Sequence, residues 1–381
     1  MGNVRFLHTA DWQLGMTRHY LAPEAQARFT AARLEAVRAI GGLAAQLDCA
    51  FVVVCGDVFE SNHIDRQVLL RALDAMRAVP VPLYLLPGNH DPLDAGSLLG
   101  SAAFRDHAPP GVHVLDSFEP REVAPGVLLH PAPWPTKHPL EDLAARALLA
   151  ADGRAAAHVL AAHGIVDALS PDAADPKLIV LARLEEAVAA GRLAYAALGD
   201  RHSVTDVGST GRVWYSGAPE ATDYDELDAG CVLAVELPAA GGAPRVERHR
   251  VGRWRFVREV RALDGADDVR RLDELLAARD DKERTVLKLG FEGTLALRDK
   301  ARLDAVLDHH RDLYAGLELW RRRTDLAVVP EDADFSDLGL TGFAADAMRE
   351  LRAAALQPGE EGEAAADALA LLVRLTAGAP S

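Results

Sequence analysis

The sequence lacks the features that mark a membrane-spanning or exported chain. None of its apolar runs reaches the roughly 18 residues that a membrane-spanning helix needs. The amino terminus enters a strand-like run at once and has no long apolar core of the signal-peptide type. Only 3 cysteines occur, and Cys49, Cys55 and Cys231 follow no paired or CxxC spacing. We therefore expect buried, reduced thiols in a cytoplasmic protein without a membrane segment.

Positive charge is also scarce. The chain carries 41 lysines and arginines against 57 acidic residues, a net charge of -16, which argues against wrapping nucleic acid by bulk electrostatics. Metal ions or a partner subunit could still supply local positive charge. One basic stretch runs from Arg245 to Arg258, with Trp254 and Phe256 between its arginines. It could bind a nucleic-acid backbone, or it could be a strand with a solvated basic face and a buried apolar face.

The length of 381 residues indicates two or three domains, and the 49% hydrophobic content is typical of globular proteins. Strand-like and helical segments alternate along the chain, and the fold class that they predict is α/β. We predict a two-sheet α/β/β/α sandwich over residues 1–252 and a small α/β domain over residues 253–330. The segment 331–381 is predicted to be helical, with helices at 342–355 and 363–376.

Side chains of metal-ligand type follow five of the strand-like runs in the first domain. The residues, each with the run that precedes it, are Asp11 and Gln13 after residues 4–7, Asp57 after 51–55, Asn89, His90 and Asp91 after 83–86, His163 after 158–161, and Asp200 and His202 after 195–198. Ligand sites in α/β folds lie at the carboxyl ends of the strands, so we expect these groups to converge. Alone, each run could be a cap or a turn, but together and in this order they predict a two-metal phosphoesterase.

Phosphoester hydrolysis with two metals gives specific roles to these residue types. Two divalent cations about 3.5–4 Å apart need a bridging carboxylate, and Asp57 is the natural candidate. His90 cannot easily be a ligand while the adjacent Asn89 is one. We expect His90 to contact the substrate phosphate or to protonate the leaving oxygen, with Asp91 orienting its ring.

Four motifs resemble those of the calcineurin-like metallophosphoesterase superfamily. They are His8-Thr-Ala-Asp-Trp-Gln-Leu-Gly15, Gly56-Asp-Val-Phe59, Pro87-Gly-Asn-His-Asp91 and His163-Gly164. The opening motif and the chain layout resemble the SbcD-type DNA repair nucleases within it. The resemblance implies that Asp11 and His202 hold one metal. It implies that Asn89 and His163 hold the other, with Asp57 bridging and His90 catalytic.

The resemblance also implies an activity and partners. SbcD-type proteins are manganese-dependent 3′ to 5′ DNA exonucleases and endonucleases that act in double-strand-break repair. They pair with an SbcC-like, SMC-type ATPase and commonly form a homodimer through the nuclease domain. In that reading, residues 253–330 cap the active site and residues 331–381 dock the ATPase. Two alternatives stay open: a phosphodiesterase for small nucleotides, and a catalytically weak architectural subunit of the same complex.

Two positions depart from the pattern of the superfamily. Gln13 stands where a metal-binding histidine is usual, and Asp200 stands where the first histidine of Gly-His-x-His is usual. Both can still coordinate through oxygen. Counted with Asp11, Asp57 and Asn89, they make the donor set mostly oxygen, with only two imidazoles. Such a set favours a hard ion such as manganese or magnesium over zinc.

Two further groups near these motifs leave less specific signals. His8 lies inside the first strand, where it could support the metal ligands or be a packed core residue. The acidic run Asp223, Asp225, Glu226 and Asp228 is predicted to be a solvated loop.

Overall fold

The computed structural model describes residues 2–151, 157–172, 174–329, 342–355, 357–362, 364–365 and 367–369. Contacts divide the chain into two compact units. Unit 1 comprises Met1–His19 and Gln26–Trp254, and unit 2 comprises Tyr20–Ala25 and Arg255–Ser381. Within the described residues, no helix is both long enough and apolar enough to cross a membrane.

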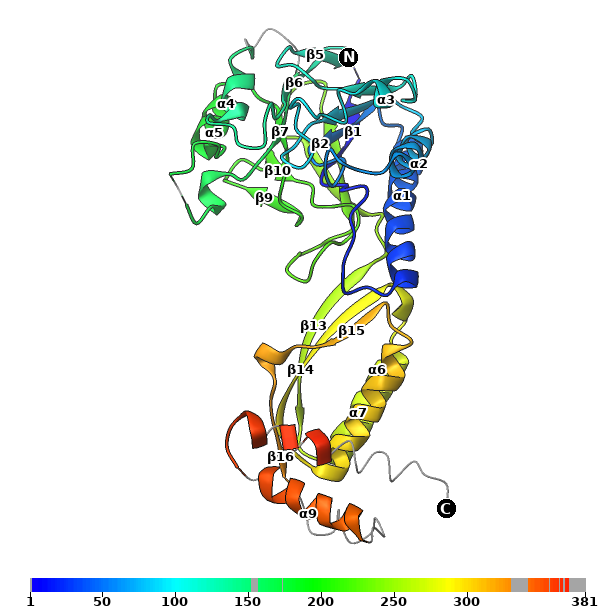
Figure 1. Ribbon diagram of the computed structural model, residues 1–381. Helices are drawn as coiled ribbons and strands as arrows, with labels where there is room; N and C mark the ends of the chain where they lie inside the picture. The colour runs from blue at the N-terminus through cyan, green and yellow to red at the C-terminus, as the bar shows by residue number, and fades with distance from the viewer. Residues whose placement is uncertain are drawn as a thin grey trace. The chain divides into compact units, whose positions relative to one another are not determined.

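Unit 1 contains two six-stranded sheets (Figure 1). The first has the order β12-β11-β1-β2-β3-β4, and its strands are β1 (Val4–Thr9), β2 (Phe51–Cys55), β3 (Leu83–Leu86), β4 (Val112–Val114), β11 (Cys231–Leu237) and β12 (Arg245–Arg250). Strands β1 to β4 run parallel to one another. Strand β11 is antiparallel to both β1 and β12, and residues 238–244 join β11 to β12.

The second sheet has the order β5-β6-β7-β8-β10-β9. Its strands are β5 (Arg121–Ala124), β6 (Val127–Ala132), β7 (Ala157–His163), β8 (Tyr195–Gly199), β9 (Thr205–Val207) and β10 (Val213–Tyr215). The central strands β6, β7, β8 and β10 are parallel. Their carboxyl ends therefore meet at one edge of this sheet.

Strand β2 explains why the two sheets stack. It reads Phe-Val-Val-Val-Cys and is buried along its whole length, so both of its faces need apolar cover. Side chains alternate across a strand. Phe51, Val53 and Cys55 face the core between the sheets. Val52 and Val54 pack in the core that the outer helices close.

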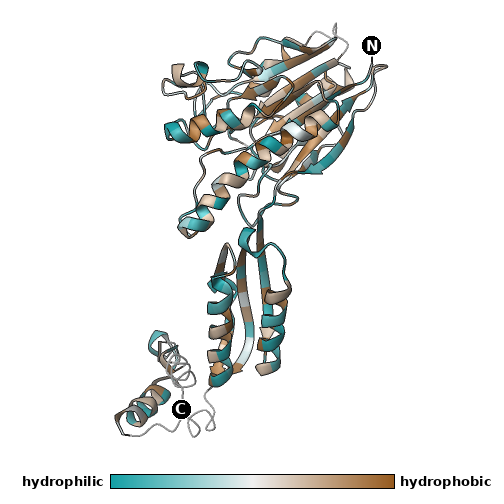
Figure 2. Ribbon diagram, turned by 90° about the vertical axis from the view of Figure 1, so that its right-hand side faces the viewer, coloured by the Kyte–Doolittle hydropathy of each residue, from teal (hydrophilic) through white to brown (hydrophobic). Residues whose placement is uncertain are grey.

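Helices cover the outer face of each sheet and complete the predicted sandwich. Helices α1 (Pro23–Gln46) and α2 (Arg66–Met76) pack on the first sheet. Helices α4 (Leu143–Leu148) and α5 (Leu181–Ala189) pack on the second. The short helices α3 (Ala102–Arg105) and η1 (Asp167–Leu169) lie in connections. Hydrophobic colour is concentrated in the strands of the sandwich, and hydrophilic colour marks much of the helix surface (Figure 2). The predicted fold class is confirmed.

Unit 2 is built on a smaller parallel sheet. Its strands are β13 (Arg255–Leu263), β14 (Thr285–Ala296), β15 (Gly316–Leu319) and β16 (Asp325–Val329), and its helices are α6 (Ala266–Ala278), α7 (Leu297–Arg311), η2 (Lys282–Arg284), η3 (Arg321–Arg323) and α9 (Phe343–Ala355). Helices α6 and α7 lie along one face of the sheet (Figure 1) and share an apolar core with it. Helix α9 matches the helix predicted at 342–355 and packs through Met348 against Leu297 and Ala301. Most of the helix predicted at 363–376 lies outside the described residues.

The basic stretch is divided between β12 and β13, and its tryptophan is not exposed for stacking against a base. Arg245, Arg248 and Arg250 are exposed on β12, an edge strand. Trp254 is 1% exposed, and its ring packs edge-on against Phe29 with centroids 4.9 Å apart. Burial of this ring favours the structural interpretation of the stretch over base stacking.

Candidate metal centre

The predicted ligands lie just beyond the strand ends, and several have unusual backbone conformations. The backbone N–H groups of Asp11 and Gln13 donate to the carbonyls of Gly56 and Asp57 at 3.1 and 2.9 Å, which joins the loops after β1 and β2. Asp11, Gln13, Asp57 and Asp200 have φ values of 54°, 43°, 52° and 95°. Residues with side chains rarely adopt positive φ, and such strain concentrates at functional sites.

Three glycines allow the strand ends to approach one another. A Cβ on Gly56 would lie 2.0 Å from Nδ1 of His163, and one on Gly88 would lie 2.3 Å from Oδ1 of Asp57. A Cβ on Gly199 would lie 1.8 Å from the carbonyl oxygen of Cys55. No side chain fits at these distances, so the close packing of the loops requires glycine at each position.

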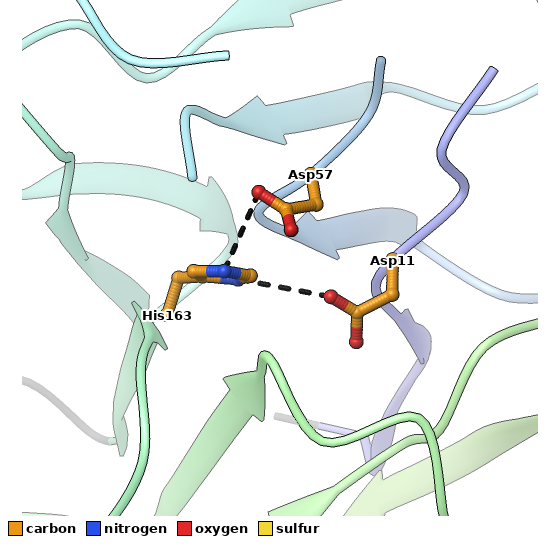
Figure 3. A group of neighbouring side chains, drawn as sticks. All are labelled: Asp11, Asp57 and His163. Atoms are coloured by element: carbon orange, nitrogen blue, oxygen red, sulfur yellow. Dashed lines mark ion pairs between the residues drawn. The ribbon is translucent and has the colours of Figure 1, made fainter. Parts of the chain in front are cut away.

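Asp11, Asp57 and His163 form the middle of the site (Figure 3). All three are buried, and each offers one ligand atom within 4.8 Å of the others. Nε2 of His163 lies 3.4 Å from Oδ1 of Asp57, and its Nδ1 lies 4.0 Å from Oδ1 of Asp11. Figure 3 shows the imidazole facing both carboxylates, with one dashed line to each. Two carboxylates and one imidazole at this spacing are a suitable donor set for a divalent cation.

Around His163, three side-chain oxygens face one ring nitrogen. Nε2 lies 2.6 Å from Oδ1 of Asn89 and 3.6 Å from Oδ1 of Asp200, in addition to its contact with Asp57. Nδ1 lies 2.8 Å from the carbonyl oxygen of Cys55 and donates to it. This bond fixes the ring so that Nε2 points into the site. We call Asn89, His163 and Asp200 the His163 half of the centre.

Asp11, Gln13 and His202 form the other half, which we call the His202 half. Nε2 of Gln13 lies 3.4 Å from Nε2 of His202, and both carboxylate oxygens of Asp11 accept from the backbone N–H of Asp200 at 3.1 Å. Oε1 of Gln13 is buried without a hydrogen-bond partner in the described part of the chain. A buried oxygen without a donor is unfavourable, and a cation is the partner that this position fits.

Glu226 belongs to the centre, although sequence analysis assigns it no such role. The prediction of a solvated acidic loop is wrong for this residue, whose side chain is 6% exposed. Its carboxylate lies 2.9 Å from Nδ1 of His202 and accepts the backbone N–H of Thr222 at 2.8 Å. The hydroxyl of Thr222 lies 2.8 Å from the same Nδ1. A metal-binding histidine is oriented by a carboxylate that is bonded to its other ring nitrogen, the one that does not face the metal. Only the tertiary contact between two loops distinguishes Glu226 from its acidic neighbours.

His90 is the accessible imidazole of the site. Its side chain is 37% exposed, and Nε2 lies 3.9 Å from Oδ2 of Asp57. Nδ1 lies 2.8 Å from the carbonyl oxygen of Glu60, and the backbone N–H donates to Oδ1 of Asp57 at 2.9 Å. The ring is therefore anchored at one nitrogen, and the other is directed towards the centre.

The prediction that Asp91 orients the ring of His90 is wrong. Asp91 is fully buried, and its two oxygens accept the backbone N–H groups of Gly88 at 2.8 Å and Phe59 at 3.0 Å. The carbonyl of Glu60 occupies the place predicted for Asp91. Asp91 instead joins the loops after β2 and β3, because its short side chain reaches backbone donors beneath them.

Burial and mutual charge shift the pKa values of the centre. Burial raises the pKa of Asp11 to about 7 and also raises that of Asp200. Burial lowers the pKa of His163, but the carboxylates of Asp57, Asp200 and Asp11 outweigh it and raise the value to about 9. The pKa of His202 reaches about 9 as well, because burial is opposed chiefly by its hydrogen bond to Glu226. Acidic groups thus concentrate where water is excluded, an environment that a divalent cation stabilises.

His8 is a structural residue beside the centre. Its two ring nitrogens lie 3.0 Å from the hydroxyl of Tyr195 and 3.1 Å from the carbonyl of Leu198. Burial lowers its pKa to about 3, so the ring is neutral. The second bond holds the end of β8, which leads into Asp200, so the packed and the supporting interpretations of His8 both apply.

Comparison with protein families identifies the part of the chain that carries most of these residues. Residues 4–184 match the family model of the calcineurin-like phosphoesterases. Over these residues the chain is similar to the calcineurin-like phosphoesterases. They include the candidate ligands from Asp11 to His163, whereas Asp200 and His202 lie beyond the matched residues.

Comparison with solved structures found distant similarities. The protein TT1561 of Thermus thermophilus is 12% identical, with a TM-score of 0.40, over 65% of this chain and 99% of that one. A dimetal phosphatase from Danio rerio is 14% identical, with a TM-score of 0.36, over 65% and 99% of the two chains. GAP50, the anchor in the inner membrane complex of Plasmodium, is 11% identical, with a TM-score of 0.39, over 66% and 89%. The comparison with curated proteins gave no match.

Proposed function

We propose that this chain is a DNA phosphodiesterase that works with two divalent cations. The observation that carries the proposal is the convergence of ligand-type and catalytic side chains from the ends of β1, β2, β3, β7 and β8 on a buried acidic centre. The partnerless Oε1 of Gln13 belongs to that centre. Because residues 4–184 match the family model of the calcineurin-like phosphoesterases, phosphoester hydrolysis is the reaction class that these residues support.

The chain offers a donor set for each cation. Asp11, Gln13 and His202 would hold one, Asn89, His163 and Asp200 would hold the other, and Asp57 would serve both. When bound, the cations neutralise charge on the phosphoryl oxygens and lower the pKa of a water molecule. Each half contributes one imidazole, and the remaining donors are oxygens. This composition supports manganese, with magnesium as the next candidate, over zinc.

In this proposal His90 acts on the substrate and does not bind metal. With Nδ1–H donated to the carbonyl of Glu60, Nε2 is the nitrogen that contacts a bound phosphate or passes a proton to the leaving oxygen. Its exposure distinguishes it from His163, which is buried among carboxylates.

DNA as the substrate, and assembly into a repair complex, rest on the SbcD-like motifs. In this proposal an SbcC-like, SMC-type ATPase docks on residues 331–381, residues 253–330 cap the site, and the nuclease domain forms a homodimer in the cytoplasm. A chain without residues 337–381 should keep manganese-dependent cleavage and lose the ATPase. Co-purification with the ATPase would locate the docking element elsewhere.

A small-nucleotide phosphodiesterase is the second candidate. A pocket of about 320 Å³ beside Asp200 and His202 favours it, because its size suits part of one nucleotide. Metal analysis, combined with hydrolysis assays in manganese, separates the candidates. The proposal predicts cleavage of single- or double-stranded DNA. Cleavage of bis(4-nitrophenyl) phosphate without DNA cleavage would favour the small-nucleotide enzyme. Absence of both metal and cleavage would favour an architectural subunit.

A further inference from the structure

The pocket beside the metal centre has two chemically different walls. One wall carries Ile165 and Leu169, which are 40% and 38% exposed although they are large and apolar. The other wall carries Asp223 and Asp225 from the acidic loop. The remaining lining residues are Asp200, Arg201, His202, Ser203, Tyr215 and Glu226.

Hydrogen bonds hold the apolar wall in place. The hydroxyl of Tyr215 donates to the carbonyl of Gly164 at 2.8 Å and accepts the backbone N–H of Val166 at 2.9 Å. These two bonds fix the chain that leads from His163 to Ile165. The wall is therefore positioned by the same segment that supplies a candidate metal ligand.

The acidic wall is tied to the other half of the centre. The backbone N–H of Leu227 donates to the hydroxyl of Ser203 at 2.9 Å, and Glu226 contacts His202. Residues 223–227 are thus anchored at the strand end that carries His202.

The charge of the pocket limits what can enter. Asp223 and Asp225 disfavour a second phosphate group, and Nε of Arg201 is engaged by the hydroxyl of Thr205 at 2.8 Å. Carboxylates accept hydrogen bonds, so they favour a neutral group that presents N–H donors. The apolar wall favours a flat ring that loses water on contact. A nucleobase combines these two properties.

We propose that this pocket holds the nucleobase of the nucleotide next to the scissile phosphate, and that it prefers guanine. Guanine presents adjacent N–H donors on its Watson–Crick edge, which one carboxylate can accept together. Ile165 and Leu169 then contact the face of the base. This inference rests on the proposed phosphodiesterase function and adds to it the part of the substrate that is recognised.

Calorimetry on the full-length, manganese-loaded protein tests the pocket. The two probes are 2′-deoxyguanosine 5′-monophosphate and 2-deoxyribose 5-phosphate, which share the phosphate and differ by the base. We expect the nucleotide to bind about tenfold more tightly, the ratio that a buried ring and one charge-assisted hydrogen bond can supply. Thymidine 5′-monophosphate should bind with an affinity between those of the two probes.

Substitutions in the two walls of the pocket test whether the base binds there. Leu169→Ala and Asp223→Asn should each reduce the affinity ratio about three- to fivefold, because each removes one of the two kinds of contact. Leu140→Ala and Asp228→Asn are the matched controls. Leu140 is 84% exposed and Asp228 belongs to the acidic loop, but neither lines the pocket. Both control proteins should keep the full ratio.

Equal affinity for the two probes would overturn the inference, and so would an unchanged ratio in both pocket variants. Hydrolysis of bis(4-nitrophenyl) phosphate by the same manganese-loaded sample distinguishes failure of the base pocket alone from failure of the proposed function. If the sample hydrolyses this diester while the probes bind equally, only the base pocket is wrong. If the protein neither binds manganese nor hydrolyses the diester, the proposed function and the pocket fall together.

Discussion

The two imidazoles of the centre, His163 and His202, are held in the same orientation by different means. In each ring Nδ1 is bonded to an acceptor and Nε2 faces the site. For His163 the acceptor is the backbone carbonyl of Cys55, the last residue of β2. For His202 the acceptors are the side chains of Glu226 and Thr222, which lie in a loop.

This difference predicts how strongly each half should bind its cation. The anchor of His163 forms whenever the sheet forms, because its acceptor is a strand backbone. The anchor of His202 requires the loop with Thr222 and Glu226 to be ordered. The conformational entropy that this loop loses on ordering opposes binding of the cation. The side chain of His202 is 25% exposed, whereas that of His163 is fully buried. We therefore expect the His202 half to bind its cation more weakly.

Loss of the shared residue should affect both halves. Asp57→Ala removes the carboxylate common to the two donor sets and leaves neighbouring acidic groups without their bridge. We expect manganese binding to fall at least about 100-fold at both positions, the upper end of losses for residues that support a metal. Titration calorimetry measures the affinity and the stoichiometry. Unchanged affinity would remove Asp57 as the bridge.

Loss of the residue that belongs to neither half should leave metal binding intact. His90→Ala removes an exposed ring that contacts substrate in this account. Both manganese ions should stay, and kcat should fall roughly 100- to 10,000-fold, the usual range for loss of a general acid. Metal analysis and steady-state kinetics check the two parts. Loss of metal in this variant would contradict the role assigned to His90.

Disturbing Gly56 should weaken the His163 half. In Gly56→Ala the new methyl group would meet Nδ1 of His163 at 2.0 Å, at a backbone φ of 90° that alanine disfavours. We expect about 2–4 kcal/mol of lost stability from the clash and the strained φ. Gly2→Ala is the control, because a Cβ there meets nothing within 4 Å. Equal urea midpoints for the two variants would show that β2 does not hold the ring as described.

Removing the carboxylate behind His202 should affect one half only. Glu226→Gln keeps the shape of the side chain but weakens the acceptor at Nδ1, and we expect one of the two manganese affinities to fall about 10- to 100-fold. Electron paramagnetic resonance should change from the signal of a coupled manganese pair to that of a single ion. Asp228→Asn, in the same loop, should keep the coupled signal. Equal weakening of both sites in Glu226→Gln would show a general structural effect instead.

The smallest effect concerns His8, which lies outside both halves. Its pKa of about 3 in the folded state is below its usual value near 6.5, so acid protonates it first in the unfolded chain. Stability should therefore fall as pH drops from 6.5 towards 3, by about 1.4 kcal/mol per pH unit from this residue. His8→Gln should lose that part of the slope in urea unfolding between about pH 4.5 and 6. An identical slope in both proteins would show that His8 titrates normally when folded.

The strands and the ligands can be predicted from the sequence because both leave local signals. The runs at 51–55 and 83–86 coincide with β2 and β3, since continuous apolar runs bounded by turns leave few alternatives. The order of ligand types then predicted which strand ends converge. Asp91 and Glu226 were assigned wrongly for the opposite reason. Asp91 bonds to a backbone N–H of another loop as well as to Gly88 in its own loop, and Glu226 contacts a histidine 24 residues away. No local pattern encodes the contacts between loops.

Diffraction at the manganese absorption edge, from crystals grown in manganese, tests whether the centre holds two cations. We expect two anomalous peaks on either side of the Asp57 carboxylate. One should be bounded by Asp11, Gln13 and His202, and the other by Asn89, His163 and Asp200. An absence of peaks in saturating manganese, or Gln13 and Asp200 turned away from the ions, would contradict this expectation.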